Sequence, residues 1–241
     1  MSIYAVSDLH GCYNLYEKIN NFIQPEDVII FLGDAGDRGP ESWKTIKAIY
    51  NNPQWIYLKG NHEDMLIKAM RAMLGENYDC SWEDRWNDPI SLCYSNGGRQ
   101  TLNDWIEDGR DEIWIQRLSY LKTTYTYLNI NNQEIVCTHA GFTDNGKNLP
   151  LTEDLLWDRY HIYNKPELIK TNRIIVHGHT PIPHLYKELK KYNLIDLDTP
   201  TFPLWYCNNK KVDIDCGSFL TNKAILLDLD TFKVITFEEE C

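Results

Sequence analysis

Five short polar clusters interrupt this chain, and each follows a run of apolar and β-branched residues that is typical of a buried strand. The clusters are Asp8–Gly11, Gly33–Gly39, Gly60–Glu63, His139–Gly141 and His177–Thr180. Loops at the carboxyl ends of neighbouring strands meet in one crevice in α/β folds, so residues far apart in sequence can share a site. Because the clusters are rich in aspartate and histidine, they predict a two-metal hydrolytic centre on an α/β fold.

The first 70 residues alternate between strand and helix patterns. Strands are expected at Ile3–Ser7, Val28–Leu32 and Trp55–Leu58, and helices at Tyr13–Phe22, Glu41–Tyr50 and His62–Met73. Such alternation predicts parallel β-α-β units with right-handed crossovers. Further strands are expected at Tyr125–Ile130, Glu134–Thr138 and Arg173–Val176. From about Tyr186 the pattern predicts a β-meander with strands Lys211–Asp215, Lys223–Asp228 and Lys233–Phe237.

The stretch Leu74–Leu121 breaks this alternation. We interpret it as a helical insertion beside the site, with helical pieces near Gln100–Glu107 and Asp111–Leu121, within a single domain that spans residues 1–241. The insertion carries four tryptophans, at Trp82, Trp86, Trp105 and Trp114, and packing of the insertion is favoured over ligand binding as their role.

Charge and cysteine content restrict the partners and the compartment. The net charge of −11 disfavours nucleic-acid backbones and anionic membranes as partners, so attraction of a phosphorylated substrate must be local. The chain contains no apolar stretch long enough to span a membrane. Seven scattered cysteines without a CxxC pair favour a reducing cytoplasm.

The first two clusters carry carboxylates at the predicted strand ends. Asp8 and His10 flank one residue, and in an extended segment both side chains would project to the same side, toward one ion. Asp34 follows the second strand, and a single carboxylate can bridge two ions. Asp37 and Arg38 lie in the same loop, where an arginine offers a fork for phosphate oxygens. A polar turn with a surface salt bridge is the alternative, and the two aspartates, one arginine and three glycines within seven residues make it less attractive.

The later clusters add nitrogen ligands. Asn61 could serve as a helix N-cap or as an oxygen ligand, and His62 could reach the crevice as a proton donor. His139 or His179 alone would more often be a structural histidine. Together with two aspartates they form a mixed nitrogen and oxygen set that suits manganese, iron or zinc rather than calcium.

The ordered series D-x-H-G, G-D-x-x-D-R-G, G-N-H-E, H-A-G and G-H-T resembles the phosphoprotein phosphatase family of calcineurin-like metallophosphoesterases, especially its bacterial and phage-lambda-type members. The motifs run from Asp8 to His179. This resemblance implies a central β-sandwich of two mixed sheets, flanked by helices, with a helical insertion beside the active site.

The resemblance also implies roles for the motif residues. One divalent ion would be held by Asp8, His10 and Asp34, and a second by Asp34, Asn61, His139 and His179, with manganese favoured over iron or zinc. A metal-bridging hydroxide would attack phosphorus. His62, oriented by Asp37, would protonate the leaving oxygen, and the phosphate would contact Arg38, Asn61 and Arg159, of which Arg159 lies in a W-D-R segment.

The roles of two further residues, His177 and Asp215, stay open. His177 precedes a predicted ligand by two residues, and Asp215 could support the site or simply end a strand. His161 lies in a polar stretch and is expected at the surface. The wider phosphodiesterase and nuclease relatives carry a second histidine two residues after the position of His179, where this chain has Pro181, and this difference favours the phosphatase branch.

The leading functional hypothesis is a metal-dependent phosphomonoesterase that acts on phosphoserine or phosphothreonine in proteins, with phosphotyrosine as a further substrate. The alternative is a symmetrical bis(5'-nucleosyl)-tetraphosphate hydrolase, which shares the same motifs. A binding scaffold on an inactive phosphatase fold is disfavoured because every ligand and the acid are retained. We expect a cytoplasmic protein, with a monomer favoured, whose partner is a phosphorylated protein or small phosphoester.

Overall fold

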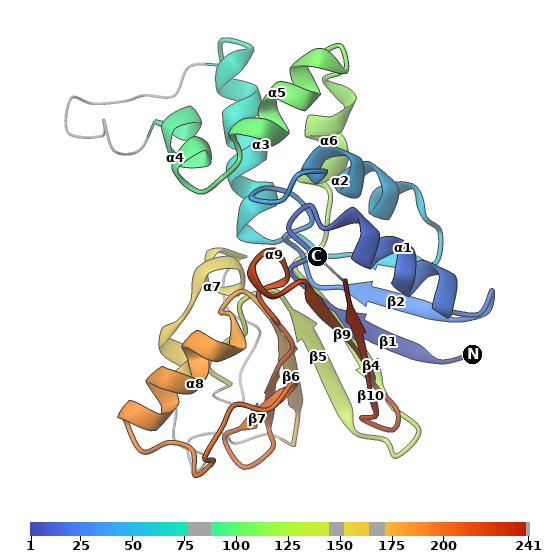
Figure 1. Cartoon of the computed structure of the whole chain (residues 1–241), viewed down its shortest axis with the longest axis vertical. Coiled ribbons are helices and arrows are strands. Elements are labelled where there is room, and N and C mark those ends of the chain that lie inside the picture. Colours follow the sequence, from blue (N-terminus) through green and yellow to red (C-terminus); the bar gives the residue numbers. More distant parts are fainter. Residues whose placement is uncertain (77–87, 145–151, 164–171, 240–241) are drawn as a thin grey trace.

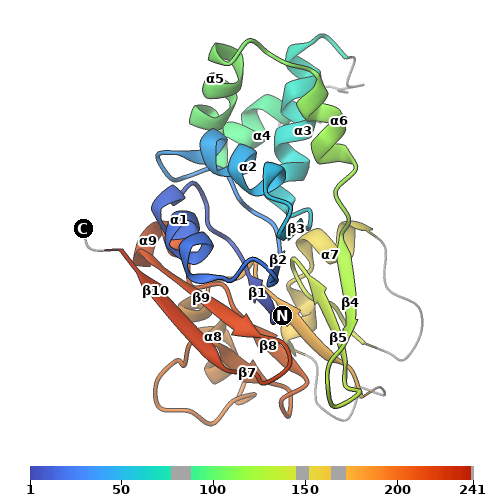
Figure 2. The ribbon, with the colours of Figure 1, turned by 90° about the vertical axis from the view of Figure 1, so that its right-hand side faces the viewer.

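The computed structural model describes residues 1–76, 88–144, 152–163 and 172–239. Within these ranges the chain forms two five-stranded mixed sheets that pack face to face, with helices on both outer sides (Figures 1 and 2). This arrangement confirms the fold class expected from the sequence.

The first sheet is built from both ends of the chain. Its strand order is β10-β9-β1-β2-β3, with bounds β1 (Ile3–Val6), β2 (Val28–Phe31), β3 (Trp55–Tyr57), β9 (Lys223–Asp228) and β10 (Val234–Glu238). Strands β1, β2 and β3 are parallel, while β9 runs antiparallel to β1 and to β10. The carboxyl ends of β1, β2 and β3 therefore lie at one edge.

The second sheet has the order β4-β5-β6-β8-β7. Its strands are β4 (Thr124–Leu128), β5 (Glu134–Thr138), β6 (Ile174–His177), β7 (Leu204–Tyr206) and β8 (Lys211–Asp213). Strands β5, β6 and β8 are mutually parallel, and β4 and β7 are antiparallel edge strands. This sheet thus also has three parallel strands whose carboxyl ends point the same way.

Successive side chains along a strand point to opposite faces of the sheet, so they pack in two different hydrophobic cores. In β2 and the residue after it, Ile30 and Leu32 pack between the two sheets, whereas Ile29 and Phe31 pack against the helices on the other face. All four side chains are fully buried. A strand that is apolar on both faces reads as a continuous hydrophobic run, which is the pattern seen in the sequence.

Helices cover the outer face of each sheet. On the first sheet lie α1 (Tyr13–Phe22) and α2 (Ser42–Asn51). The helix α3 (Asn61–Met73) and the insertion helices α4 (Pro89–Ser95), α5 (Arg99–Glu107) and α6 (Ile113–Ser119) pack with one another and with α2 beyond the end of the sheet (Figure 2). On the second lie α7 (Thr152–Trp157), the short 3-10 helix η2 (Tyr160–Tyr163) and α8 (Ile182–Lys191). A short helix, α9 (Ser218–Thr221), joins β8 of one sheet to β9 of the other.

The helical insertion is confirmed where the structure describes it. Trp105 is fully buried and Trp114 is nearly so, and both pack in the core that joins the insertion to α2. Trp82 and Trp86 lie outside the described residues. The assignment of the chain to a single domain stays a prediction.

The three strands expected in the last third are confirmed as β8, β9 and β10, but their expected arrangement as a β-meander is wrong. The chain forms the helix α8 after Pro181 and the unanticipated strand β7, and it then divides its remaining strands between the two sheets. Ile182, Leu185 and Leu189 lie on one buried face of α8, so the helical period was present in the sequence. Assignment of β8 to one sheet and β9 to the other depends on long-range pairing, which local patterns do not encode.

Five cysteines in the described ranges are free and buried, and Cys80 and Cys241 lie outside those ranges. None of the described helices combines the length and apolar character that a membrane span requires.

Candidate active site

The five clusters meet at the edge where the parallel strands of both sheets end. Asp8 and His10 follow β1, Asp34 and Asp37 follow β2, and Asn61 and His62 open α3 after β3. His139 follows β5 and His179 follows β6. The side chains of these residues are all buried, with His179 the most exposed at 6%. The first sheet thus provides carboxylates, an amide and two imidazoles, while the second provides two further imidazoles.

The loops that carry these residues have unusual backbone conformations. Asp8, His10, Asp34 and His179 have φ angles of 52°, 43°, 60° and 70°, in the left-handed region. A non-glycine residue in this region costs on the order of 1–2 kcal/mol, and such residues concentrate at functional sites. The expectation that Asp8 and His10 share an extended segment is therefore wrong. Their loop turns beyond the strand, where His10 N donates to Asp34 O at 3.0 Å.

Four predicted ligand atoms converge in one part of the site. Asn61 Oδ1 lies 2.8 Å from His139 Nε2 and 2.9 Å from His179 Nδ1, and these two nitrogens are 3.1 Å apart. Asp34 Oδ2 lies 3.4 Å from His139 Nε2. Asn61 is not the N-cap, because Gly60 holds that position and Asn61 is the first helical residue. Its side chain is therefore available to the cluster.

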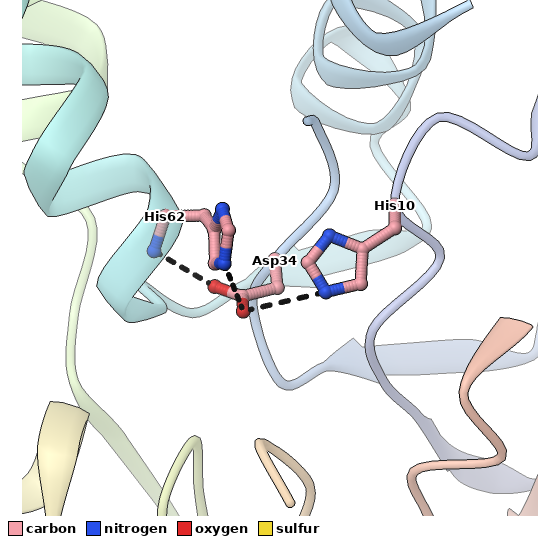
Figure 3. Close-up of side chains that lie close together, drawn as sticks. All are labelled: His10, Asp34 and His62. Carbon is pink, nitrogen blue, oxygen red and sulfur yellow. Dashed lines mark hydrogen bonds and ion pairs between the residues drawn. The ribbon is translucent and has the colours of Figure 1, made fainter. Parts of the chain in front are cut away.

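Asp34 also faces the other part of the site (Figure 3). Its Oδ2 atom lies 3.7 Å from His10 Nε2 and 3.8 Å from His62 Nε2, between the two rings. Ligand atoms of Asp34 thus group with His10 and His62 on one side and with His139 and His179 on the other. A carboxylate shared by both groups is the arrangement that a bridging ligand requires.

Asp8 lies beside the site without joining either of the two compact groups of ligand atoms. Asp8 Oδ2 accepts the backbone N–H of His179 at 3.1 Å. The other oxygen, Oδ1, is buried and finds no hydrogen-bond partner among the described residues. A buried carboxylate oxygen without a donor is a site that a cation would satisfy.

Backbone carbonyls determine which imidazole nitrogens face the centre. His10 Nδ1 lies 2.8 Å from Gly36 O, and His139 Nδ1 lies 3.0 Å from Leu32 O. A carbonyl oxygen can only accept, so Nδ1 carries the proton in both rings and Nε2 presents its lone pair to the site. Burial lowers the pKa of His139 to about 3 and that of His10 well below its usual value. Both rings are thus neutral, as metal ligands must be.

The carboxylates show the complementary electrostatics. Burial, followed by the neighbouring charge of Asp215, raises the pKa of Asp8 well above its usual value. Burial, followed by the charges of Glu63 and Asp8, does the same for the pKa of Asp34. Divalent cations would relieve this repulsion. The orphan oxygen, the neutral imidazoles and the crowded carboxylates together fit a centre for two such ions.

Two glycines permit the close approach of these loops. A Cβ atom on Gly178 would lie 2.0 Å from Asp8 Oδ2, and one on Gly60 would lie 2.1 Å from Asp34 Oδ1. Any side chain at either position would displace a predicted ligand oxygen. The glycines in the G-H-T and G-N-H-E motifs therefore have a steric explanation.

His62 and Asp37 form a buried pair beside the ligand groups. His62 Nδ1 lies 2.7 Å from Asp37 Oδ2, and Thr101 of the insertion donates its Oγ1 hydroxyl to Asp37 Oδ1 at 2.6 Å. The guanidinium of Arg38 donates to His62 Nε2 at 2.9 Å and to His10 Nε2 at 3.0 Å. His62 Nε2 therefore faces the same space as the Arg38 guanidinium, opposite its Asp37 contact.

Arg159 approaches the site from the second sheet. Its side chain is exposed, and its positive charge contributes to lowering the pKa of His139 and of His179, although burial is the largest cause for both. The ring of the nearby Trp157 contacts His179 edge-on at 6.4 Å. Arg159 therefore adds a second positively charged side chain, after Arg38, beside the predicted ligands.

Glu63 is a site residue that the sequence reasoning missed. Its Oε2 accepts the backbone N–H groups of Asp34 at 2.9 Å and Gly60 at 2.8 Å. Its Oε1 accepts Ala35 N–H at 2.9 Å and the Tyr57 hydroxyl at 2.7 Å. A glutamate three residues after a helix N-cap was the available signal, because that spacing defines a capping box.

The expectation that His161 lies at the surface is wrong. It is 1% exposed, and Lys211 Nζ donates to its carbonyl at 2.9 Å and lies 3.2 Å from its Nδ1 atom. His177 belongs to the same buried cluster, since its Nε2 lies 2.8 Å from the hydroxyl of Tyr206. A polar sequence context suggested exposure, but polar partners from β7 and β8 contact the Nδ1 atom of the ring inside the protein, while its Nε2 atom has no hydrogen-bond partner among the described residues.

Asp215 lies two residues after β8 and is 2% exposed. Its Oδ1 accepts Gly217 N–H at 2.7 Å, and burial raises its pKa to about 7. Its charge contributes to the raised pKa of Asp8, so Asp215 lies beside the predicted ligands, and a supporting role there stays a prediction.

Comparison with known proteins agrees with this geometry. The family of calcineurin-like phosphoesterases matches residues 1–214, and the chain belongs to this family. It is therefore a hydrolase of the metallophosphoesterase superfamily, and the resemblance found in its motifs is confirmed at this level.

Related proteins carry two kinds of name. Serine/threonine-protein phosphatase 2 of Salmonella typhimurium is 28% identical over 165 residues, which cover 65% of this chain and 67% of the relative. The asymmetrical bis(5'-nucleosyl)-tetraphosphatase PrpE of Bacillus subtilis is 25% identical over 232 residues, covering 83% and 86% respectively. Other relatives are named symmetrical tetraphosphatases. The comparisons thus give the superfamily and leave two substrate classes.

A solved metallophosphoesterase structure from Sphaerobacter thermophilus has the same fold, with a TM-score of 0.56 at 14% identity, over 100% of this chain and 88% of that chain.

Proposed function

We propose that this protein is a metal-dependent phosphomonoesterase that hydrolyses phosphoserine and phosphothreonine in proteins, with phosphotyrosine as a further substrate. The observation that carries the proposal is the position of Asp34 between two groups of ligand atoms, next to the buried pair of His62 and Asp37. A phosphoester hydrolase needs charge neutralisation and a proton donor at the same phosphorus, and this arrangement offers both.

The proposed ligand sets follow the two sides of Asp34. One ion would be held by Asp8, His10 and Asp34, and the other by Asp34, Asn61, His139 and His179, with manganese favoured over iron or zinc. When bound, the two ions lower the pKa of a water molecule and neutralise charge on the phosphoryl group. The other two tasks, proton donation to the leaving group and contact with the phosphate, are assigned to side chains of the protein.

His62 is the proposed proton donor. Its Nδ1–H is held by Asp37, so the ring is oriented with Nε2 toward the substrate. Arg38, Asn61 and Arg159 would contact the phosphate. Arg38 and Arg159 are exposed residues beside the buried ligands, which suits their guanidinium groups to contact phosphoryl oxygens that enter from solvent.

The alternative is hydrolysis of bis(5'-nucleosyl) tetraphosphates. The likeness to the Bacillus subtilis tetraphosphatase, which spans more of both chains than the likeness to the phosphatase, favours this candidate. The same ligands and the same proton donor would serve both reactions.

A substrate panel separates the two. Purified protein with added manganese is offered p-nitrophenyl phosphate, a set of phosphopeptides and diadenosine tetraphosphate. We expect the phosphopeptides to be preferred. A strong preference for the dinucleotide would overturn the phosphoprotein proposal, and its products would show whether cleavage is symmetrical or asymmetrical. No turnover of any substrate by metal-loaded protein would favour a binding scaffold.

Two variants test the proposed roles. His62→Ala should lower turnover by about 10²–10⁴-fold with its metal content unchanged, because it removes the donor and leaves the proposed ligands. Asp34→Ala should lose both turnover and bound metal. The measurements are steady-state kinetics and metal content by mass spectrometry. Full activity of His62→Ala would exclude the proton-donor role, and loss of one ion from that variant would show that His62 is a ligand instead.

A further inference from the structure

Phe219 brings an aromatic ring from the far end of the chain to the predicted phosphate site. The residue lies on α9, the short helix that joins the two sheets (Figure 1). Gly217, with φ of 68°, and Asn222, with φ of 54°, bound this helix, and Gly217 N–H is held by Asp215. The ring is half-buried and packs on the helical core of the first sheet.

The ring contacts two residues of the site. The guanidinium carbon of Arg38 lies 4.9 Å from the centre of the Phe219 ring, within the range of a cation–π contact. The ring of His10 meets Phe219 edge-on at 5.5 Å. Phe219 lies outside the five polar clusters of the sequence.

Arg38 is contacted by three parts of the molecule: the helical insertion, two histidines of the site and the C-terminal segment. Its backbone N–H donates to Gly97 O at 3.1 Å. The insertion also packs closely on the aliphatic part of the Arg38 side chain, because a Cβ atom added to Gly97 would lie only 2.8 Å from Arg38 Cγ. The guanidinium donates to the Nε2 atoms of His10 and His62. Phe219 covers it from the C-terminal segment.

The contact between Phe219 and the Arg38 guanidinium does not compete with catalysis, unlike the two hydrogen bonds to histidine. His10 Nε2 cannot accept from Arg38 while it binds a metal ion, and His62 Nε2 cannot do so while it carries the proton for the leaving group. Both hydrogen bonds must therefore be released when the site works. The ring face of Phe219 and the backbone of Gly97 remain.

From this geometry we infer that Phe219 is a positioning residue, which holds the Arg38 guanidinium on its ring face so that the arginine can bind phosphoryl oxygens. This inference rests on the proposed function, because that function assigns Arg38 to the phosphate. It predicts that the aromatic character of residue 219, and not only its size, determines affinity for phosphate.

The test compares Phe219→Leu and Phe219→Tyr in manganese-loaded protein. Leucine keeps an apolar side chain in the core but removes the ring face, so we expect KM for a phosphoester and Kd for inorganic phosphate to rise by about two- to fivefold. Tyrosine keeps the ring face and should restore both values. Leu220→Ala is the matched control, because its neighbouring side chain on α9 is 73% exposed, and it should leave both values unchanged.

A double-mutant cycle with Arg38→Ala separates positioning from general stability. If Phe219 acts through Arg38, Phe219→Leu should cause no further loss of phosphate affinity in the Arg38→Ala background. Equal losses in the two backgrounds, or a wild-type affinity in Phe219→Leu, would overturn the inference. Wild-type protein that binds phosphate without turnover would overturn the proposed function alone, and the cycle would still decide the inference by phosphate binding. Protein that does neither would overturn both.

Discussion

Glu63 shows how much of the site depends on a residue that touches no predicted substrate atom. Its carboxylate accepts hydrogen bonds from Asp34, Ala35, Gly60 and Tyr57, so it ties the loop after β2 to the start of α3. Burial, followed by the charge of Glu63, raises the pKa of Tyr57 well above its usual value, which keeps the phenol protonated as a donor. Glu63 therefore aligns Asp34 with Asn61.

We predict that Glu63→Gln lowers the free energy of unfolding by about 1–3 kcal/mol, because its amide group turns a donor toward buried N–H groups and leaves them unpaired. The same change should weaken metal binding through Asp34. Tyr57→Phe is the control, since it removes one of the donors and keeps the carboxylate, and it should cost less. Chemical denaturation and metal titration measure both effects. Equal stability of Glu63→Gln and wild type would contradict this role.

For single residues, the sequence predicted well which side chains come together at the site, but it predicted their backbone conformation and burial poorly. Spacing and motif order brought Asp34, Asn61, His139 and His179 to one place, as the structure shows. The positive φ of Asp8 and the burial of His161 were not foreseen. Both depend on contacts with distant strands, such as those between Lys211 and His161, which local composition cannot report.

Among the elements, α5 of the insertion has a specific link to the site. Thr101 donates to Asp37 Oδ1 at 2.6 Å and accepts Asp37 N–H at 3.2 Å, so the insertion fixes the carboxylate that orients His62. The sequence predicted a helical insertion beside the site but offered no means to tell which of its faces would contact Asp37.

Thr101→Val should lower turnover by about tenfold, because partners that orient a catalytic or ligand group typically contribute 10–100-fold. Valine keeps the shape of threonine and removes both hydrogen bonds. The control is Thr45→Val in α2, where a buried threonine donates only to the Glu41 carbonyl at 2.8 Å. Steady-state kinetics on both variants, with thermal unfolding to confirm folding, decide the point. A similar loss in both variants would mean that the effect is one of packing.

The whole molecule contributes through the partition of ligands between two sheets. Asp8, Asp34 and Asn61 follow strands of the first sheet, whereas His139 and His179 follow strands of the second. Sheet membership could not be predicted, because β8 and β9 are neighbours in sequence and still pair with different partners. Metal ions bound by the proposed ligands would therefore join the sheets at their shared edge.

Removal of metal should consequently destabilise the entire fold. An ion present at a hundred times its Kd stabilises the folded state by about 2.7 kcal/mol, which corresponds to roughly 5–10 °C in Tm for a chain of this size. We expect a chelator to lower Tm by this amount and manganese to restore it, as followed by scanning calorimetry. Asp34→Ala should show little response to either. Identical Tm values with and without chelator in the wild type would argue against the centre.

The order of the strands also determines when this site can exist during synthesis. The acidic ligands leave the ribosome first, but the last imidazole emerges only at His179, and β1 is not covered on its open side until β9 has been made. A nascent or prematurely terminated chain therefore displays clustered carboxylates without the imidazoles that would complete the centre. The proposed centre can therefore be complete only after the chain has been made as far as His179 and its strands have paired.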